Sequence, residues 1–84
     1  MEPLIRKIKP ILESEFAGAT VQLEPASPEG RVTGLLVWSG FEGIKQIRRQ
    51  GRLWKVLKKK LSPQEQLQVT GILTVTPEEM AVSD

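Results

Sequence analysis

The sequence predicts an α+β domain in which helices pack on one face of a three-stranded sheet, in the order α-β-β-α-β-α. Two short β-type runs separated by a turn predict a hairpin, and a third β-type run follows a long helical segment. A strand that follows such a helix returns to the same sheet, and one layer of helices on that sheet is the simplest arrangement. With 84 residues the chain is long enough for one small core, so we expect a single domain over residues 1–84.

The first predicted element is an amphipathic helix over residues 2–16, where apolar residues recur at spacings of three and four. Pro10 complicates this helix, because an interior proline removes a hydrogen bond and costs about 3 kcal/mol. Two alternatives stay open. Either the helix is kinked at Pro10, or a loose first turn precedes a short helix with Pro10 near its start.

Three segments in the first half of the chain predict the hairpin. Residues 20–24 alternate apolar and polar side chains, which is typical of a half-buried strand. Residues 25–30 contain two prolines and a glycine and predict a turn. Residues 31–39 form a more continuous β-type run, which indicates a strand with much of both faces covered.

The second half of the chain predicts a helix, a strand and a short final helix. The basic helix ends near Leu61, because Ser62 and Pro63 disfavour its continuation, and residues 64–66 read as a linker or short turn. Residues 67–76 predict the third strand, with a bulge at Gly71.

The C-terminal segment predicts a short helix that begins at a capped threonine. Thr76 is placed as the N-cap and Pro77 as the first helical residue, and two acids follow in the first turn. We expect residues 81–84 to form a frayed tail.

The composition argues against catalysis and against a metal site. The chain has no cysteine and no histidine, which removes thiolate and imidazole ligands and histidine-based proton transfer. The neighbouring acids at 13 and 15 and at 78 and 79 read as solvated helix charges. We therefore expect no enzyme activity, no cofactor and no metal. No apolar run approaches the roughly 18 residues of a membrane span, and the N-terminus lacks a signal-peptide pattern, so we expect a soluble, cytoplasmic protein.

The charge distribution is strongly segregated. Eight Lys or Arg residues fall between positions 45 and 60 without an acid among them, which leaves four cations against ten acids elsewhere, a net charge of −6. At about 100° per residue, six residues form an apolar side that we expect to face the core. All the cations except Lys58, which falls toward the apolar side, occupy an arc of about 140° on the other side. The apolar side consists of Ile44, Ile47, Gly51, Trp54, Leu57 and Leu61. The candidate nucleic-acid contacts are Arg48, Arg49, Arg52, Lys55, Lys59 and Lys45.

Three explanations of this basic face stay open. An anionic partner such as DNA or RNA would use it, glutamates of the same chain or a second subunit would neutralise it, or it serves solubility alone. The segment from Gly40 to Gly43 is formally a Gly-x-x-Gly loop of the kind through which KH domains approach a nucleic-acid backbone. A tight strand-to-helix turn with Phe41 in the core is the favoured reading of the same residues.

Several of these residues resemble the central pattern of the BolA-like family. Phe41, Gly43, Arg49, Trp54 and Leu57 match its positions without a gap. The strand that ends at residue 39 and the ending "ILTVTPEEM" are similar to the family's strands. The resemblance implies an α+β fold similar to class II KH domains, and a small non-catalytic module that binds nucleic acid or has a regulatory role.

Departures from the family pattern limit what the resemblance implies. Where the family usually has Arg-His-Arg, this chain has Arg49, Gln50 and Gly51, and the family's histidine at the last strand falls near Gln68. The loop between the first two strands carries neither cysteine nor histidine. The alternative function is therefore an adaptor for a monothiol glutaredoxin or another acidic protein, without an iron–sulfur ligand from this chain. A weak homodimer also stays open.

Overall fold

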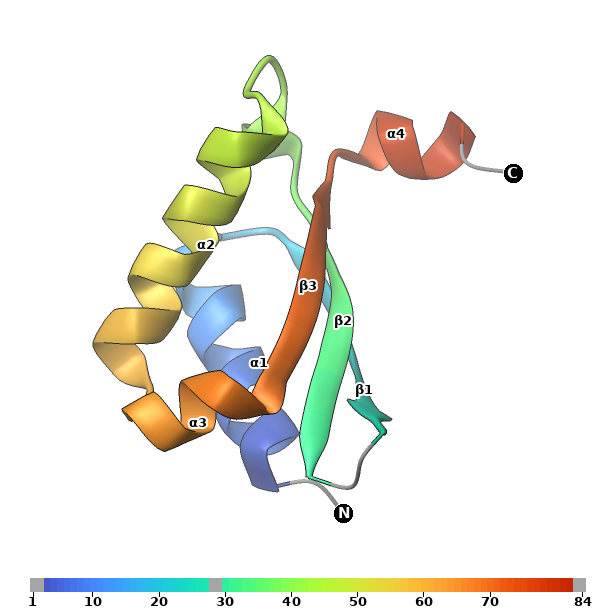
Figure 1. Cartoon of the computed structure of the whole chain (residues 1–84). Helices are drawn as coiled ribbons and strands as arrows, with labels where there is room; N and C mark the ends of the chain where they lie inside the picture. Colours follow the sequence, from blue (N-terminus) through green and yellow to red (C-terminus); the bar gives the residue numbers. More distant parts are fainter. Residues whose placement is uncertain (1–2, 28–29, 83–84) are drawn as a thin grey trace.

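A computed structural model describes residues 3–27 and 30–82 and shows a three-stranded sheet with helices (Figure 1). The elements are α1 Pro3–Glu15, β1 Thr20–Ala26, β2 Arg31–Val37, a 3₁₀ turn Ser39–Phe41, α2 Gln46–Lys60, α3 Pro63–Gln68, β3 Val69–Val75 and α4 Pro77–Val82. The predicted α+β class and the order of the predicted elements are confirmed, with α3 added between α2 and β3.

The sheet has the strand order β1-β2-β3. β1 and β2 are antiparallel and form the predicted hairpin, and β3 returns parallel to β2. The register shifts by one residue between Val69 and Gly71, so the bulge predicted at Gly71 is found at the preceding residue. Thr70 has no register partner on β2, although its hydroxyl donates to the Val32 carbonyl at 3.0 Å. β2 is the central strand, and none of its residues is exposed.

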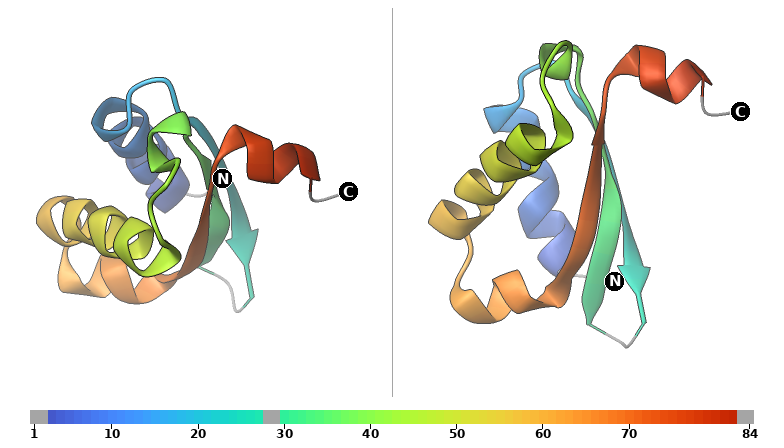
Figure 2. Two further views of the ribbon diagram at one scale, coloured as in Figure 1. Left: turned by 90° about the horizontal axis from the view of Figure 1, so that it is seen from above. Right: turned by 45° about the horizontal axis from the view of Figure 1, so that its top comes forward.

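α1 and α2 lie side by side on one face of the sheet, while α4 extends away on the opposite side (Figures 1 and 2). The core lies between this helical layer and the sheet, and its buried residues come from both. They are Ile8, Leu12, Phe16, Val21, Leu36, Phe41, Leu53, Leu57, Leu61, Val69 and Ile72.

Three aromatic rings close one end of the core. Trp38 packs edge-on against Phe16 and against Phe41, with 5.1 Å between ring centroids in each pair. The Trp38 indole N–H donates to the carbonyl of Ala17 at 2.9 Å, which satisfies its polar end. Phe41 is fully buried, as predicted for a strand-to-helix turn.

α1 runs through Pro10 as one helix, so the alternative that places Pro10 near the start of a short helix is wrong. Pro10 cannot donate to the carbonyl of Arg6, and its ring clashes with that turn. Because both residues are exposed, water can reach the orphaned carbonyl. Ile8 and Leu12, which precede and follow Pro10 in the sequence, are both buried and form the core-facing side of α1.

The predicted linker over residues 64–66 is wrong, because α3 occupies this segment. The Ser62 hydroxyl accepts from the Glu65 N–H at 3.2 Å, and the Glu65 carboxylate accepts from the Ser62 N–H at 2.8 Å. Together with Pro63 at the first helical position, this capping box begins a helix that the Ser-x-x-Glu sequence encodes.

The ends of other elements also differ slightly from expectation. β1 continues to Ala26, so Pro25 belongs to an edge strand rather than to the predicted turn, of which residues 28 and 29 lie outside the described residues. Thr76 caps α4 as predicted, since the Glu79 N–H donates to its hydroxyl at 3.1 Å. α4 includes residues 81 and 82, which were expected to fray, and residues 83 and 84 lie outside the described part.

Candidate nucleic-acid interface

The turn before α2 needs both of its glycines for structural reasons. Gly43 has a φ of 77°, which side chains rarely tolerate. A Cβ on Gly40 would lie 2.5 Å from the Trp38 ring, so Gly40 is required for packing. The tight-turn reading of Gly40 and Gly43 is therefore sufficient, and the Gly-x-x-Gly spacing needs no ligand to explain it.

α2 presents a different side to the core from the one predicted. Its buried residues are Arg49, Leu53 and Leu57, whereas Ile47 is 81% exposed. Gly51 is exposed as well, and Trp54 is only half-buried against the core. The prediction that the apolar side of the helical wheel faces the sheet is thus wrong for Ile47 and Gly51.

The edge of β3 that has no neighbouring strand in the described part of the chain lies next to α2 and explains which side of α2 faces inward. The Gln46 side-chain amide donates to the Thr74 carbonyl at 2.8 Å, and the Gln50 amide donates to the Ile72 carbonyl at 2.9 Å. The Thr74 hydroxyl in turn donates to the Gln46 amide oxygen at 2.8 Å. Backbone carbonyls on this edge require hydrogen-bond donors because α2 covers them. Polar side chains of α2, rather than apolar ones, therefore point toward β3.

Arg49 belongs to this inward polar side and is only 5% exposed. Its guanidinium donates to the Thr74 carbonyl at 3.2 Å and to both carboxylate oxygens of Glu79, at 2.7 and 3.1 Å. Its Nε donates to the Ile44 carbonyl at 2.6 Å. The prediction that Arg49 faces water with the other cations is therefore wrong, because its guanidinium joins α2, β3 and α4.

The other predicted contacts do face water. We call them the outward cations, and they are Lys45, Arg48, Arg52, Lys55 and Lys59, all exposed. The ion pairs found within residues 3–27 and 30–82 are Lys7–Glu65 at 2.9 Å and Arg49–Glu79 at 2.7 Å. None of the outward cations forms an ion pair with a carboxylate in that part of the chain.

Arg52 differs from the other outward cations because aromatic rings hold its side chain. Its guanidinium carbon lies 5.0 Å from the Trp38 ring centroid and 5.7 Å from that of Phe16. Such cation–π contacts restrict a side chain while leaving its N–H groups available to an anion. Arg52 is therefore partly organised before any ligand arrives.

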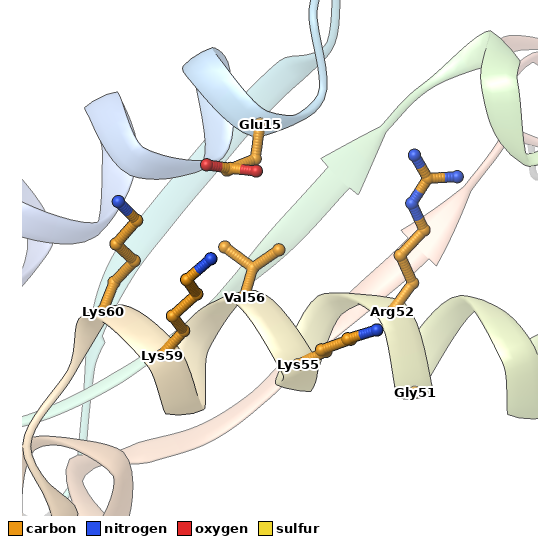
Figure 3. A pocket seen from close by; sticks show the side chains of 7 residues that line it. All are labelled: Glu15, Gly51, Arg52, Lys55, Val56, Lys59 and Lys60. Atoms are coloured by element: carbon orange, nitrogen blue, oxygen red, sulfur yellow. The ribbon is translucent and has the colours of Figure 1, made fainter.

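Two hollows lie along the outward face of α2 and meet at Gly51 and Arg52. One, of about 430 Å³, separates α2 from the end of α1, and the other, of about 820 Å³, lies toward the start of α2. Figure 3 shows the first, with Arg52, Lys59 and Lys60 rising from α2 and Glu15 across from them. We call these two adjoining hollows the trough: cations line both, and Glu15 is the one acid among the described residues that line them.

Three described acids have shifted pKa values: Glu65, whose pKa the hydrogen bond from Lys7 lowers, and Glu78 and Glu79 of α4. The hydrogen bond from Arg49, supported by the Thr76 N–H, lowers the pKa of Glu79 to about 2. The neighbouring Glu42 carboxylate raises the pKa of Glu78. None of these carboxylates forms an ion pair with an outward cation in the described part of the chain.

The described residues contain no group of three or more acids that could hold a metal ion. No helix among residues 3–27 and 30–82 has the length and apolar character needed to cross a bilayer.

Comparison with known proteins identifies the fold through structure rather than sequence. No protein-family model matches the chain, and no curated protein sequence matches it. The solved structure of BolA1 from Arabidopsis thaliana superposes with a TM-score of 0.70, covering 94% of this chain and 98% of that one at 20% identity. The expected BolA-like fold is thereby confirmed.

Proposed function

We propose that this chain, which has the BolA-like fold, is a non-catalytic module that binds nucleic acid through the outward cations of α2. One observation carries the proposal. Every outward cation is exposed and lacks an ion pair with a described carboxylate, although the chain holds ten acids. Concentrating like charge in this way destabilises a fold unless a partner uses the charge.

Among the described residues, ion pairing with an acid accounts for one cation of α2, Arg49. Glu79 pairs with Arg49, and Glu65 pairs with Lys7 of α1, so two of the available glutamates are already used away from the trough. A phosphate backbone would supply the missing anions, and its contacts need no sequence code.

A salt titration with a charge-neutralising variant tests this function. Binding of short labelled DNA and RNA would be followed by fluorescence anisotropy from about 50 to 200 mM salt. Replacing Arg48, Lys55 and Lys59 by Gln should reduce the slope of log affinity against log salt by about 2, since each phosphate contact contributes roughly 0.7 to 0.9.

A matched control carries the same loss of charge elsewhere. Arg6→Gln, Lys9→Gln and Arg31→Gln remove three cations that lie outside α2 and have no ion pair among the described residues. This variant should keep a slope close to that of the wild type. Equal slopes in the wild type and the α2 variant would contradict the proposal.

The alternative is an adaptor for an acidic protein, a monothiol glutaredoxin among them. The exposed Ile47 beside the cations favours it, because protein interfaces combine apolar and charged contacts. The chain has no histidine or cysteine, so it cannot supply the imidazole or thiolate ligand that a shared iron–sulfur cluster takes. Mixing with a cluster-loaded glutaredoxin tests this: binding without any change in the visible spectrum would support the adaptor.

A further inference from the structure

An apolar strip runs beside the outward cations along α2. It consists of Ile44, Ile47, Gly51 and Trp54, of which Ile47 is 81% exposed and Ile44 and Trp54 are half-buried. Ile44, Ile47 and Gly51 line the same hollow as the cations Lys45, Arg48 and Arg52. The trough therefore has an apolar side and a cationic side, which is more than phosphate binding requires.

Gly51 has no role in packing the fold. A Cβ at this position would meet nothing within 4 Å, and its φ is not positive. A glycine inside a helix lowers helix stability relative to alanine, so its presence on an open surface needs another reason. Gly51 lines both hollows, so the absence of a side chain there lets a ligand approach the helix backbone between Ile47 and Lys55.

We infer that this face takes single-stranded nucleic acid in preference to duplex, an inference that rests on the proposed function. A single strand offers phosphates to the cations and unstacked bases to the apolar strip at the same time. In a duplex the base faces are already stacked, so Ile47 and Trp54 would gain little contact. The α2 helix spans about 20 Å at 1.5 Å per residue, enough for a few nucleotides.

The position of α2 in the helical layer also favours a single strand over a duplex. An α-helix reads duplex DNA by entering the major groove, which requires access from several sides. Here α1 lies beside α2 in the same layer, and the end of α1 contributes Glu15 to the trough (Figure 2). A flexible strand can follow this trough, whereas a rigid duplex would meet α1.

The test compares mixed-sequence oligonucleotides of about 12 nucleotides, single-stranded and as duplex, by anisotropy at one salt concentration. The wild type should bind the single strand at least fivefold more tightly. Ile47→Ser should weaken single-strand binding about fivefold and leave duplex and heparin binding unchanged, because it removes apolar contact and no charge. Leu73→Ser is the matched control: Leu73 is 68% exposed, lies on β3, and should leave every affinity unchanged.

The outcomes separate this inference from the function on which it rests. Duplex binding as tight as single-strand binding, or single-strand binding unaffected by Ile47→Ser, would overturn the inference and leave the proposed function standing. If the wild type bound neither form nor heparin at low salt, the proposed function would fail and the inference with it. An acidic peptide that binds more tightly than either oligonucleotide, in an Ile47-dependent way, would overturn both in favour of a protein partner.

Discussion

Arg48 and Arg49 are adjacent in sequence but lie on different sides of α2. Arg49 is buried and donates to two backbone carbonyls and to Glu79, whereas Arg48 is exposed with no ion pair among the described residues. The same contrast extends along the helix, since the side chains of Gln46 and Gln50 bond to β3 while the outward cations face water. A charge whose partners lie inside the fold is explained by stability, and only the unpartnered charge points to a ligand.

The largest expected effect comes from removing Arg49. Arg49→Met should lower the free energy of unfolding by about 2 to 3 kcal/mol, because it leaves the Thr74 carbonyl without that donor and Glu79 without its cation. Urea denaturation measures this directly. Arg48→Met removes the same charge from the outward side and should change stability by less than about 0.5 kcal/mol. Similar losses in the two variants would abolish the distinction between the two sides.

The next effect concerns the edge of β3. Gln50→Ala removes the donor to the Ile72 carbonyl and to the Thr74 hydroxyl, and should cost about 1 to 2 kcal/mol. Gln64→Ala is the control, since Gln64 is exposed on α3 and makes no side-chain hydrogen bond among the described residues. An unprotected strand edge also favours association between chains. Light scattering should therefore detect more self-association in Gln50→Ala than in Gln64→Ala.

Gly51→Ala should raise the free energy of unfolding, whereas the substitutions at Arg49 and Gln50 lower it. The substitution meets no neighbouring atom and improves helix propensity, so stability should rise by about 0.5 to 1 kcal/mol. The new methyl group narrows the surface between the two hollows, so affinity for a single strand should fall. A stabilised variant with unchanged affinity would mean that Gly51 has no part in binding.

The smallest expected effect is a pH dependence of stability that comes from the ion pair between Arg49 and Glu79. Arg49 lowers the pKa of Glu79 from 4.5 to about 2, so the carboxylate is favoured in the folded state. Its contribution to stability is complete above pH 4.5 and is lost as the pH falls toward 2. The difference in urea midpoint between wild type and Glu79→Gln should narrow over this range. Glu65, whose pKa is also lowered, is present in both proteins and cancels from the difference.

Much of the fold could be predicted from the sequence because it depends on local patterns. The alternation of apolar and polar residues predicts the strands, and Thr76 followed by Pro77 predicts the start of α4. The α3 helix was missed although its Ser62 and Glu65 form a capping box that the sequence displays. The Ser-x-x-Glu pattern is local and indicates a helix start, so this helix is encoded in the sequence.

The rotation of α2 could not be predicted in the same way. Arg49 meets Thr74 and Glu79, which are 25 and 30 positions away in the chain, and Gln46 and Gln50 meet β3 over similar separations. A helical wheel contains no information about such partners, so it assigned Ile47 to the core and Arg49 to water. The exposure of the outward cations was predicted correctly, because no carboxylate of the described residues pairs with them.

The stacking of Arg52 on Trp38 gives the molecule an intrinsic optical reporter. Indole emission responds to a charged group held near the ring, and here the guanidinium lies 5.0 Å from the ring centroid. An anion bound in the trough would contact Arg52, which lines both hollows, and so alter this environment without touching the tryptophan. Occupancy of the outward face of α2 would thus be visible in the fluorescence of an unlabelled protein, and Trp38→Phe would remove this part of the signal.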